Sequence, residues 1–311
     1  MLSKEEITAW FKTLQDNICN ALELEDGKDG MPDRQVKFIE DNWNREEGGG
    51  GRTRIIQNGN VIEKGGVLFS AVHGDVPDFL KNEANAPTTN NSQPTTKFYA
   101  TGVSIVIHPN SPMVPIIHMN VRYFEMSNGV WWFGGGIDLT PHYIIEEDAK
   151  FFHEALKRSC DKHNANYYPD FKKWADDYFF ISHRKETRGV GGIFFDKLTS
   201  SEKNGKEQLF AFVQEVGNTF APTYTQLMSK NKKRAFTEEN KQWQLLRRGR
   251  YVEFNLVYDK GTKFGLETNG RVESILMSLP KIAGWEYNFS PVPGSPEEKT
   301  LSFLKKGINW I

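Results

Sequence analysis

The run from Pro115 to Glu125 constrains the fold more than any other part of the sequence. In a β-strand, alternate residues face opposite sides of the sheet. One face of this run is apolar and carries Ile117, Met119, Val121 and Tyr123. The other face carries His118, Asn120 and Arg122, spaced about 6.6 Å apart, so one ligand could contact all three. We therefore predict a strand with a core face and a polar row that binds a ligand.

The same alternation is also typical of an ordinary antiparallel sheet with one face in water. Two observations favour a functional row. It contains none of the Lys, Glu, Thr or Ser residues that are usual on a solvated strand face. The glycines at 134–136 follow two tryptophans, and a glycine triplet in a strand usually has a local reason. Both interpretations stay open on the pattern alone.

The segments on either side extend the predicted site. The strand Val103–His108 places Ser104 on one face together with His108. After the glycine triplet, Asp138 is expected where a strand ends, because Thr140 followed by Pro141 is typical of a helix start. A carboxylate at this strand-to-helix joint, beside the polar row, is a candidate catalytic group.

The remaining patterns predict the fold class. A capping box at Ser3–Glu6 and an apolar stripe behind it predict an N-terminal helix within residues 1–26. Helices are also expected over 145–160 and 207–228, and alternation predicts a strand over 250–258. Hairpin-linked strands and helices in blocks, without a βαβ repeat, indicate an α+β protein with a large, mostly antiparallel sheet. We predict a single domain over 1–311, with a surface loop at 85–96.

Composition narrows the function classes. The net charge of -1 gives no field that would attract nucleic acid or an anionic membrane. No apolar run approaches the ~20 residues of a membrane-spanning helix. The acidic N-terminus contradicts an organelle transit peptide, and the two cysteines form no metal or disulfide pattern. We expect a cytoplasmic protein without a transmembrane segment.

Arginines dominate the candidate binding residues, which favours a carboxylate ligand. Arg52 follows a run of four glycines, in what could equally be a plain mobile loop, and Arg184 and Arg188 precede another glycine-rich segment. His118 could transfer a proton. A polycarboxylate with a flat, nitrogen-containing body fits this set. Alternatively, a metal could be bound by the histidines, namely His108, His118, His153 and His183, although no two of them share a helix at i,i+4 spacing.

At these residues the chain closely resembles the oxygen-dependent coproporphyrinogen III oxidases of haem biosynthesis. The matching motifs cover most of Asn42 to Pro291 in order. They are Gly102–Pro109, His118–Phe124, Trp131–Pro141, Lys172–Trp174, His183–Arg184, Arg188–Asp196, Arg247–Asn255 and Glu273–Pro280.

The resemblance implies a homodimer built on a large antiparallel sheet with helices on both faces. It implies oxidative decarboxylation of two propionates of coproporphyrinogen III to vinyls. O2 is the acceptor, CO2 and H2O2 are released, protoporphyrinogen IX is formed, and neither a metal nor an organic cofactor is needed. By the same resemblance, His118 is a proton donor and Asp138 lies under the pyrrole N–H groups. The implied substrate contacts are Ser104, Asn120, Val121, Arg122, Asn269, Gly270 and Arg271.

Two other functions remain to be separated from this one. A non-catalytic tetrapyrrole carrier would need the arginines, but not a placed acid and base. A histidine-metal-dependent oxygenase would lose its activity to a chelator.

Overall fold

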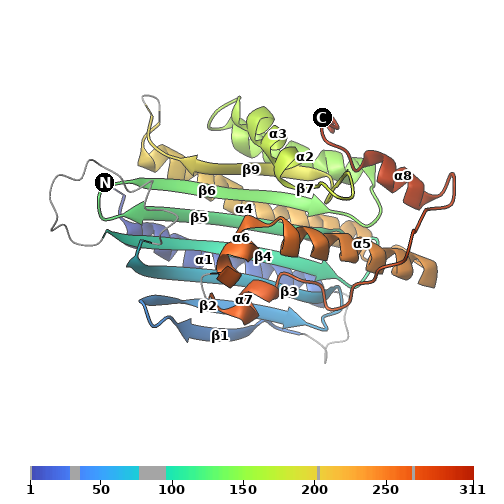
Figure 1. The fold of residues 1–311 in the computed structure, drawn as a ribbon, viewed down its shortest axis with the longest axis horizontal. Helices are drawn as coiled ribbons and strands as arrows, with labels where there is room; N and C mark the ends of the chain where they lie inside the picture. The colour runs from blue at the N-terminus through green and yellow to red at the C-terminus, as the bar shows by residue number, and fades with distance from the viewer. Residues whose placement is uncertain (1, 29–35, 77–95, 202–203, 268–269) are drawn as a thin grey trace.

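A single antiparallel sheet forms the centre of this computed structural model, which describes residues 2–28, 36–76, 96–201, 204–267 and 270–311. Within these ranges the strand order is β1-β2-β3-β4-β5-β6-β9, so almost every strand pairs with its neighbour in the chain (Figure 1). The strands are β1 (Ile39–Asn44), β2 (Gly49–Gln57), β3 (Ile62–Asp75), β4 (Lys97–Pro109), β5 (Ile116–Met126), β6 (Trp131–Thr140) and β9 (Gly191–Leu198). A separate small pair consists of β7 (Phe180–Ile181) and β8 (Glu186–Thr187).

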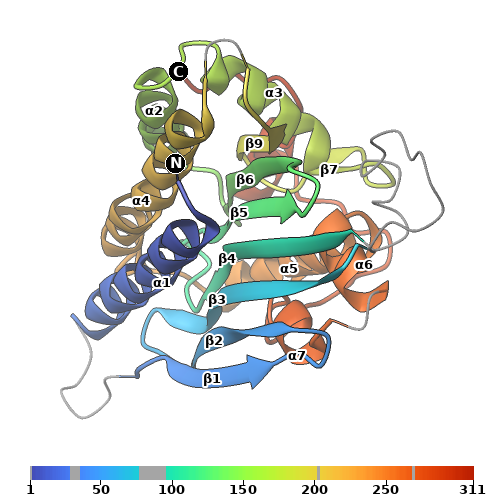
Figure 2. The same cartoon turned by 90° about the vertical axis from the view of Figure 1, so that its left-hand side faces the viewer.

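Helices cover both faces of the sheet (Figure 2). One face packs against α1 (Lys4–Gly27), α2 (Glu146–Asp161) and α4 (Lys206–Asn231). The other lies behind α5 (Glu238–Val257), α6 (Lys260–Glu267) and α7 (Val272–Leu276). Two further helices are α3 (Tyr167–Tyr178) and α8 (Pro296–Phe303). The predicted α+β class, with a large antiparallel sheet between helices, is confirmed.

The edge strand β9 is protected by α3. Phe171 of α3 packs on Phe195 at a ring distance of 5.4 Å, and Trp174 packs on Phe194 at the same distance. A helix along an edge strand blocks pairing with another chain.

The main core lies between the sheet and the face that carries α1, α2 and α4. The apolar side of β5 faces it, because Ile117, Met119, Val121 and Tyr123 are all fully buried. On the neighbouring strand, Phe133 stacks on Phe210 of α4 at 5.8 Å. This burial of one side fixes the register of β5, since a slip of one residue would bury the polar row instead.

Two local predictions are wrong. The predicted strand over 250–258 is instead the end of a helix, because α5 continues to Val257. Thr140 and Pro141 do not start a helix: Asp138 lies inside β6, and α2 begins at Glu146. The predicted loop at 85–96 falls, except for Thr96, outside the described residues.

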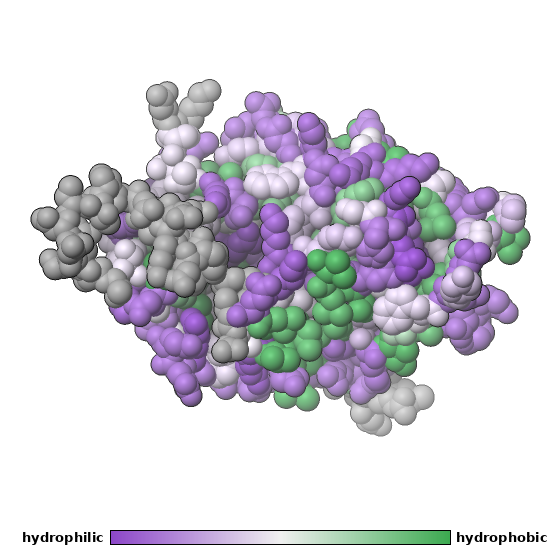
Figure 3. All heavy atoms as spheres, in the orientation of Figure 1, coloured by the Kyte–Doolittle hydropathy of each residue, from purple (hydrophilic) through white to green (hydrophobic). Residues whose placement is uncertain are grey.

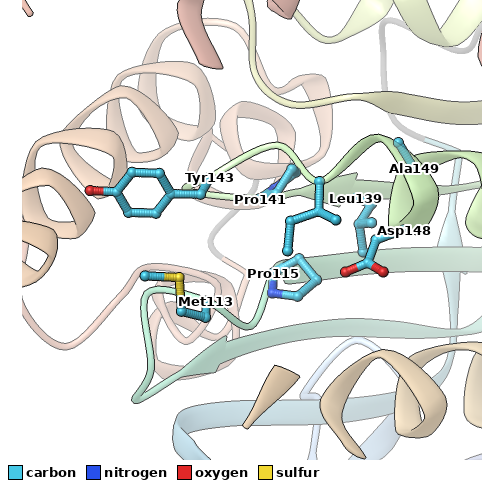
Figure 4. Close-up of a pocket in the computed structure, with 8 residues that line it drawn as sticks. Met113, Pro115, Leu139, Pro141, Tyr143, Asp148 and Ala149 are labelled. Atoms are coloured by element: carbon cyan, nitrogen blue, oxygen red, sulfur yellow. The ribbon is translucent and has the colours of Figure 1, made fainter. Parts of the chain in front are cut away.

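Two further observations concern the molecule as a whole. Every helix in the described ranges is too short or too polar to cross a membrane. A small cavity of about 10 Å³ lies near the start of α2, lined by residues that include Met113, Tyr143 and Asp148 (Figure 4). It has room for about one water molecule, so a larger ligand must bind elsewhere.

Candidate active site

The polar row lies on the sheet face that α5, α6 and α7 partly cover. His118 of β5 pairs across the sheet with Val106 on one side and with Asp138 on the other. Val106 and Ile116 pack on Tyr251 of α5, which identifies this face. In Figure 1, α5 to α7 pass in front of the right and lower parts of the sheet, so the left ends of β5, β6 and β9 are not behind a helix.

A line of neighbouring residues also runs across the strands, from Asn120 of the polar row towards β1. The cross-strand neighbours of Asn120 are, in order, Ser104, Leu68, Thr53 and Asp41. Four strand steps separate Asn120 from Asp41, which is about 19 Å. The predicted contacts Ser104 and Asn120 therefore sit side by side, and the same face continues to the β1 edge.

Arg271 lies over that far end of the row. Its guanidinium forms an ion pair with Asp41, and Ser274 of α7 shares a hydrogen bond of 3.0 Å with Thr53. The main chain at Gly270 is held by a hydrogen bond from its N–H to the carbonyl of Gly265, 2.8 Å long. Asn269 lies outside the described residues. Arg122 and Arg271 thus place two cations on one face, several strands apart.

The site contains a relay of three hydrogen-bonded groups, Arg188, Asp138 and His118. Asp138 accepts hydrogen bonds from Arg188 Nη2 to both carboxylate oxygens, at 2.7 and 2.8 Å, and from Arg188 Nε at 3.2 Å. His118 Nδ1 lies 2.8 Å from Asp138 Oδ1. The exposed fractions of Arg188 and Asp138 are only 3% and 1%, whereas the His118 side chain is 20% exposed. His118 is therefore the member of the relay that can reach a ligand.

This arrangement fixes the protonation of the relay. Burial acts to raise the pKa of Asp138, but the charge of Arg188 and the hydrogen bond from His118 outweigh it, so the pKa falls below its usual value. An ionised carboxylate only accepts hydrogen bonds, so Nδ1 of His118 must carry the hydrogen. Nε2 makes no hydrogen bond within the described part of the chain and is left to exchange a proton with a ligand.

Aromatic rings enclose the guanidinium of Arg188. Its central carbon lies 4.5 Å from the ring centre of Phe179 and 4.6 Å from those of Tyr251 and Phe254. Arg188 Nη1 donates to Asn255 Oδ1 of α5 at 2.9 Å. The rings exclude water while they attract the cation, so the buried charge pair is held tightly in place.

Arg122 is the more accessible cation of the site. Its Nη1 donates to Asn120 Oδ1 and its Nη2 to Asp196 Oδ1, both at 2.8 Å. The exposed fractions of the Arg122 and Asp196 side chains are 37% and 32%. A Cβ at Gly134 would come within 2.5 Å of Asp196 Oδ1 and 2.9 Å of Arg122 Nε, so only glycine leaves room for this pair.

The other predicted contacts do not join this cluster. Val121 points into the core on the opposite face, which leaves only its main chain near the polar row. Arg52 contacts Gln15 and Asp16 of α1, and Arg184 forms a two-pronged ion pair with Glu253 of α5. Arg188 is at the site, but the carboxylate that it binds is Asp138.

Two site residues were absent from the sequence prediction. Asp196 follows two phenylalanines in β9, and its place beside Arg122 depends on a strand pairing that the sequence does not specify. Asn255 was assigned to a strand, so its contact with Arg188 could not be foreseen. Its spacing of four from Tyr251, also buried, was a usable helical signal.

Each of the four histidines considered as metal ligands contacts other partners, and that of His118 is Asp138. His108 Nε2 is 2.8 Å from the carbonyl oxygen of Ser278, and His153 lies between Tyr168 and Val190. His183 contacts Tyr258 and Glu253. In the residues that the structure describes, no three His, Cys, Asp or Glu side chains form a group that could hold a metal.

The fold and the site define a class: an α+β protein whose open sheet face carries arginine side chains beside a histidine–aspartate pair. The comparisons identify the family. The coproporphyrinogen III oxidase family model matches residues 6–310, so the chain belongs to this family.

Three curated relatives are similar over nearly the whole chain. An Arabidopsis thaliana protein, "Coproporphyrinogen-III oxidase 1, chloroplastic", is 46% identical over 99% of this chain and 81% of its own length. The Drosophila melanogaster "Oxygen-dependent coproporphyrinogen-III oxidase" is 49% identical over 96% of this chain and 76% of its own. The Glycine max "Oxygen-dependent coproporphyrinogen-III oxidase, chloroplastic" is 48% identical over 96% and 77%.

Proposed function

We propose that this oxygen-dependent coproporphyrinogen-III oxidase binds its substrate on the open sheet face and processes it beside His118. The observation that carries the proposal is the convergence of Arg122, Asn120 and Ser104 on one face with the exposed edge of the relay. Propionate carboxylates suit the guanidinium groups of Arg122 and Arg271. To bind, a propionate must compete with Asp196 or Asp41 for these arginines, or add to the pair.

The reaction balance explains why a proton donor is needed. Each propionate, –CH2–CH2–COO⁻, loses CO2 and a hydride equivalent to become –CH=CH2. O2 accepts the hydride and one further proton to give H2O2. The side-chain conversion therefore consumes one proton for each carboxylate that is processed, and His118 Nε2 is a donor that the buried relay keeps oriented.

Asp138 acts in this proposal through His118, and it also places negative charge beneath the substrate. With Arg188 bound to both of its oxygens, the charge of Asp138 is largely balanced in the resting site. The family resemblance implies that Asp138 contacts pyrrole N–H groups directly. For that contact, Asp138 would have to use an oxygen lone pair that is not already occupied by Arg188 or His118. No metal or organic cofactor is part of the proposal, and O2 is a co-substrate.

The test is turnover of coproporphyrinogen III in air and under nitrogen, each with and without EDTA, followed by the fluorescence of the oxidised vinyl product. We expect turnover that depends on oxygen and resists EDTA. Loss of activity in EDTA would instead support the metal-dependent oxygenase, and tight binding without turnover would support the carrier.

A His118→Gln variant tests the proton donor. We expect kcat to fall about 10²- to 10⁴-fold, the usual contribution of a general acid. His183→Gln is the matched control, because His183 lies away from the row and contacts Glu253. Equal kcat values for the two variants would contradict the assignment of His118.

The proposal includes a homodimer formed through α5 to α7. Large apolar side chains are exposed there, and Figure 3 shows an apolar patch over α6 and α7. They are Leu256, Val257, Leu266 and Val272. An exposed apolar patch of this kind is typical of an interface. A monomeric sedimentation coefficient for the active enzyme would contradict it.

A single domain over 1–311 and a cytoplasmic location also remain proposals. Two of the relatives are named chloroplastic, so the location of this chain needs a direct measurement. Cell fractionation of the native host would decide it.

A further inference from the structure

Three aromatic rings form a wall at the open end of the sheet face. The rings of Phe98 and Phe124 are parallel within 5° at a distance of 5.8 Å. Phe124 also stacks on Trp132 at 4.3 Å, with 21° between the planes. The wall therefore crosses β4, β5 and β6, and its three side chains are partly exposed. None of them belongs to the site described above.

The wall stands directly beside Arg122. Phe124 is two residues beyond Arg122 on β5, hence on the same face and about 6.6 Å away. Trp132 is two residues before Gly134, the position that makes room for the guanidinium of Arg122. Ala100, opposite Phe124 on β4, adds only a methyl group to this surface. The cation of Arg122 thus lies beside an apolar surface formed by the wall and Ala100.

Such a pair of surfaces recognises a ligand that carries a charged arm on an apolar ring. A carboxylate held by Arg122 at the end of a two-carbon arm brings its ring alongside Phe124 and Trp132. In the tetrapyrrole, each pyrrole ring that carries a propionate also carries a methyl group on the adjacent carbon. That methyl group would face the wall.

We propose that Phe98, Phe124 and Trp132 form a subsite for the methyl-bearing edge of the pyrrole whose propionate Arg122 holds, and that this subsite selects against a carboxymethyl group in place of the methyl. The inference rests on the proposed function, since it assumes that Arg122 binds a propionate. Selection follows from desolvation: an ionised carboxylate pressed against the faces of aromatic rings loses water, and the ring faces offer it no hydrogen-bond donor in return. A methyl group at the same place gains apolar contact.

The experiment compares two ligands under nitrogen, where neither is consumed: coproporphyrinogen III and its analogue with carboxymethyl groups in place of the four methyls. Dissociation constants are measured for the wild type, Trp132→Lys and Trp132→Phe. We expect the wild type to prefer coproporphyrinogen III. The lysine should weaken coproporphyrinogen III binding about five- to ten-fold and tighten the analogue, because the added cation can pair with its extra carboxylate. Phenylalanine restores an aromatic ring and should keep the wild-type preference.

Phe236→Lys is the control, since Phe236 is exposed just before α5, far along the chain from the wall. It adds the same charge and should leave both constants unchanged. An identical ligand preference in the wild type and in a folded Trp132→Lys protein would overturn the subsite. A failure of the proposed function looks different: the wild type would then bind coproporphyrinogen III without oxygen-dependent turnover, whatever the two constants show.

Discussion

The buried pair of Arg188 and Asp138 gives a prediction whose size can be worked out from the structure. We consider Arg188→Met, Asp138→Asn and the double variant. Arg188→Met removes three hydrogen bonds to Asp138 and one to Asn255, and leaves a carboxylate that is 1% exposed with His118 as its remaining partner. Breaking a buried ion pair from one side costs about 3–5 kcal/mol. Asp138→Asn should cost a similar amount, because it strands a guanidinium among three aromatic rings.

The double variant should be much more stable than the sum of the two single changes predicts. With both charges gone, neither buried ion is left uncompensated, and methionine fills the aromatic box with apolar contact. We expect a favourable coupling free energy of about 2 kcal/mol or more between the two substitutions.

Urea unfolding at pH 7, with circular dichroism and tryptophan fluorescence as independent probes, measures the three free energies. Arg184→Met is the control, since the Arg184 side chain is 38% exposed and its pair with Glu253 should contribute about 1 kcal/mol or less. Additive effects, equal within about 0.5 kcal/mol to the sum of the single variants, would refute the reasoning.

Two further predictions concern pH and the glycine beneath Arg122. Burial lowers the pKa of His108 to about 3 and that of His153 to about 4. Below pH ~6.5 these two histidines are therefore protonated in the unfolded chain but stay neutral in the folded chain. The free energy of unfolding is fully present above pH ~6.5 and should fall as the pH drops towards 4. The decrease should be up to about 1.4 kcal/mol per pH unit for each histidine. Urea unfolding at several pH values checks this, and a free energy that stays constant from pH 7 to pH 5 would contradict it. Gly134→Ala should fold, since the atoms in its way are the ends of the Arg122 and Asp196 side chains, but the displaced guanidinium should raise KM about ten-fold. Gly284→Ala, with its nearest neighbour at 3.4 Å, should leave KM unchanged.

How much of this could be predicted from sequence depended on the range of the interactions involved. The polar row of β5 and the buried apolar face behind it follow from two-residue periodicity within one strand, so the sequence was enough to predict both. The fold class followed from hairpin-linked strands, which are local in the chain as well.

The errors fall where distant residues decide the structure. Residues 250–258 alternate like a strand and contain β-branched and aromatic residues, yet they are helical because one helix can place Tyr251, Phe254 and Asn255 together around Arg188. Asp138 was expected at a strand end. It lies inside β6 because its charge is met by an arginine fifty residues further along the chain. No local pattern reports either partner.

The order of the strands has a consequence for the growing chain. Neighbouring strands can pair soon after each leaves the ribosome, since the connections from β1 to β3 and from β4 to β6 are short. His118 and Asp138 can therefore meet early. Arg188 and then α5 follow much later, so until then only His118 and water can compensate the charge of Asp138. Synthesis of the last third of the chain, which contains α5, thus excludes water from Asp138. In a nascent sheet without α5, Asp138 should remain exposed to solvent.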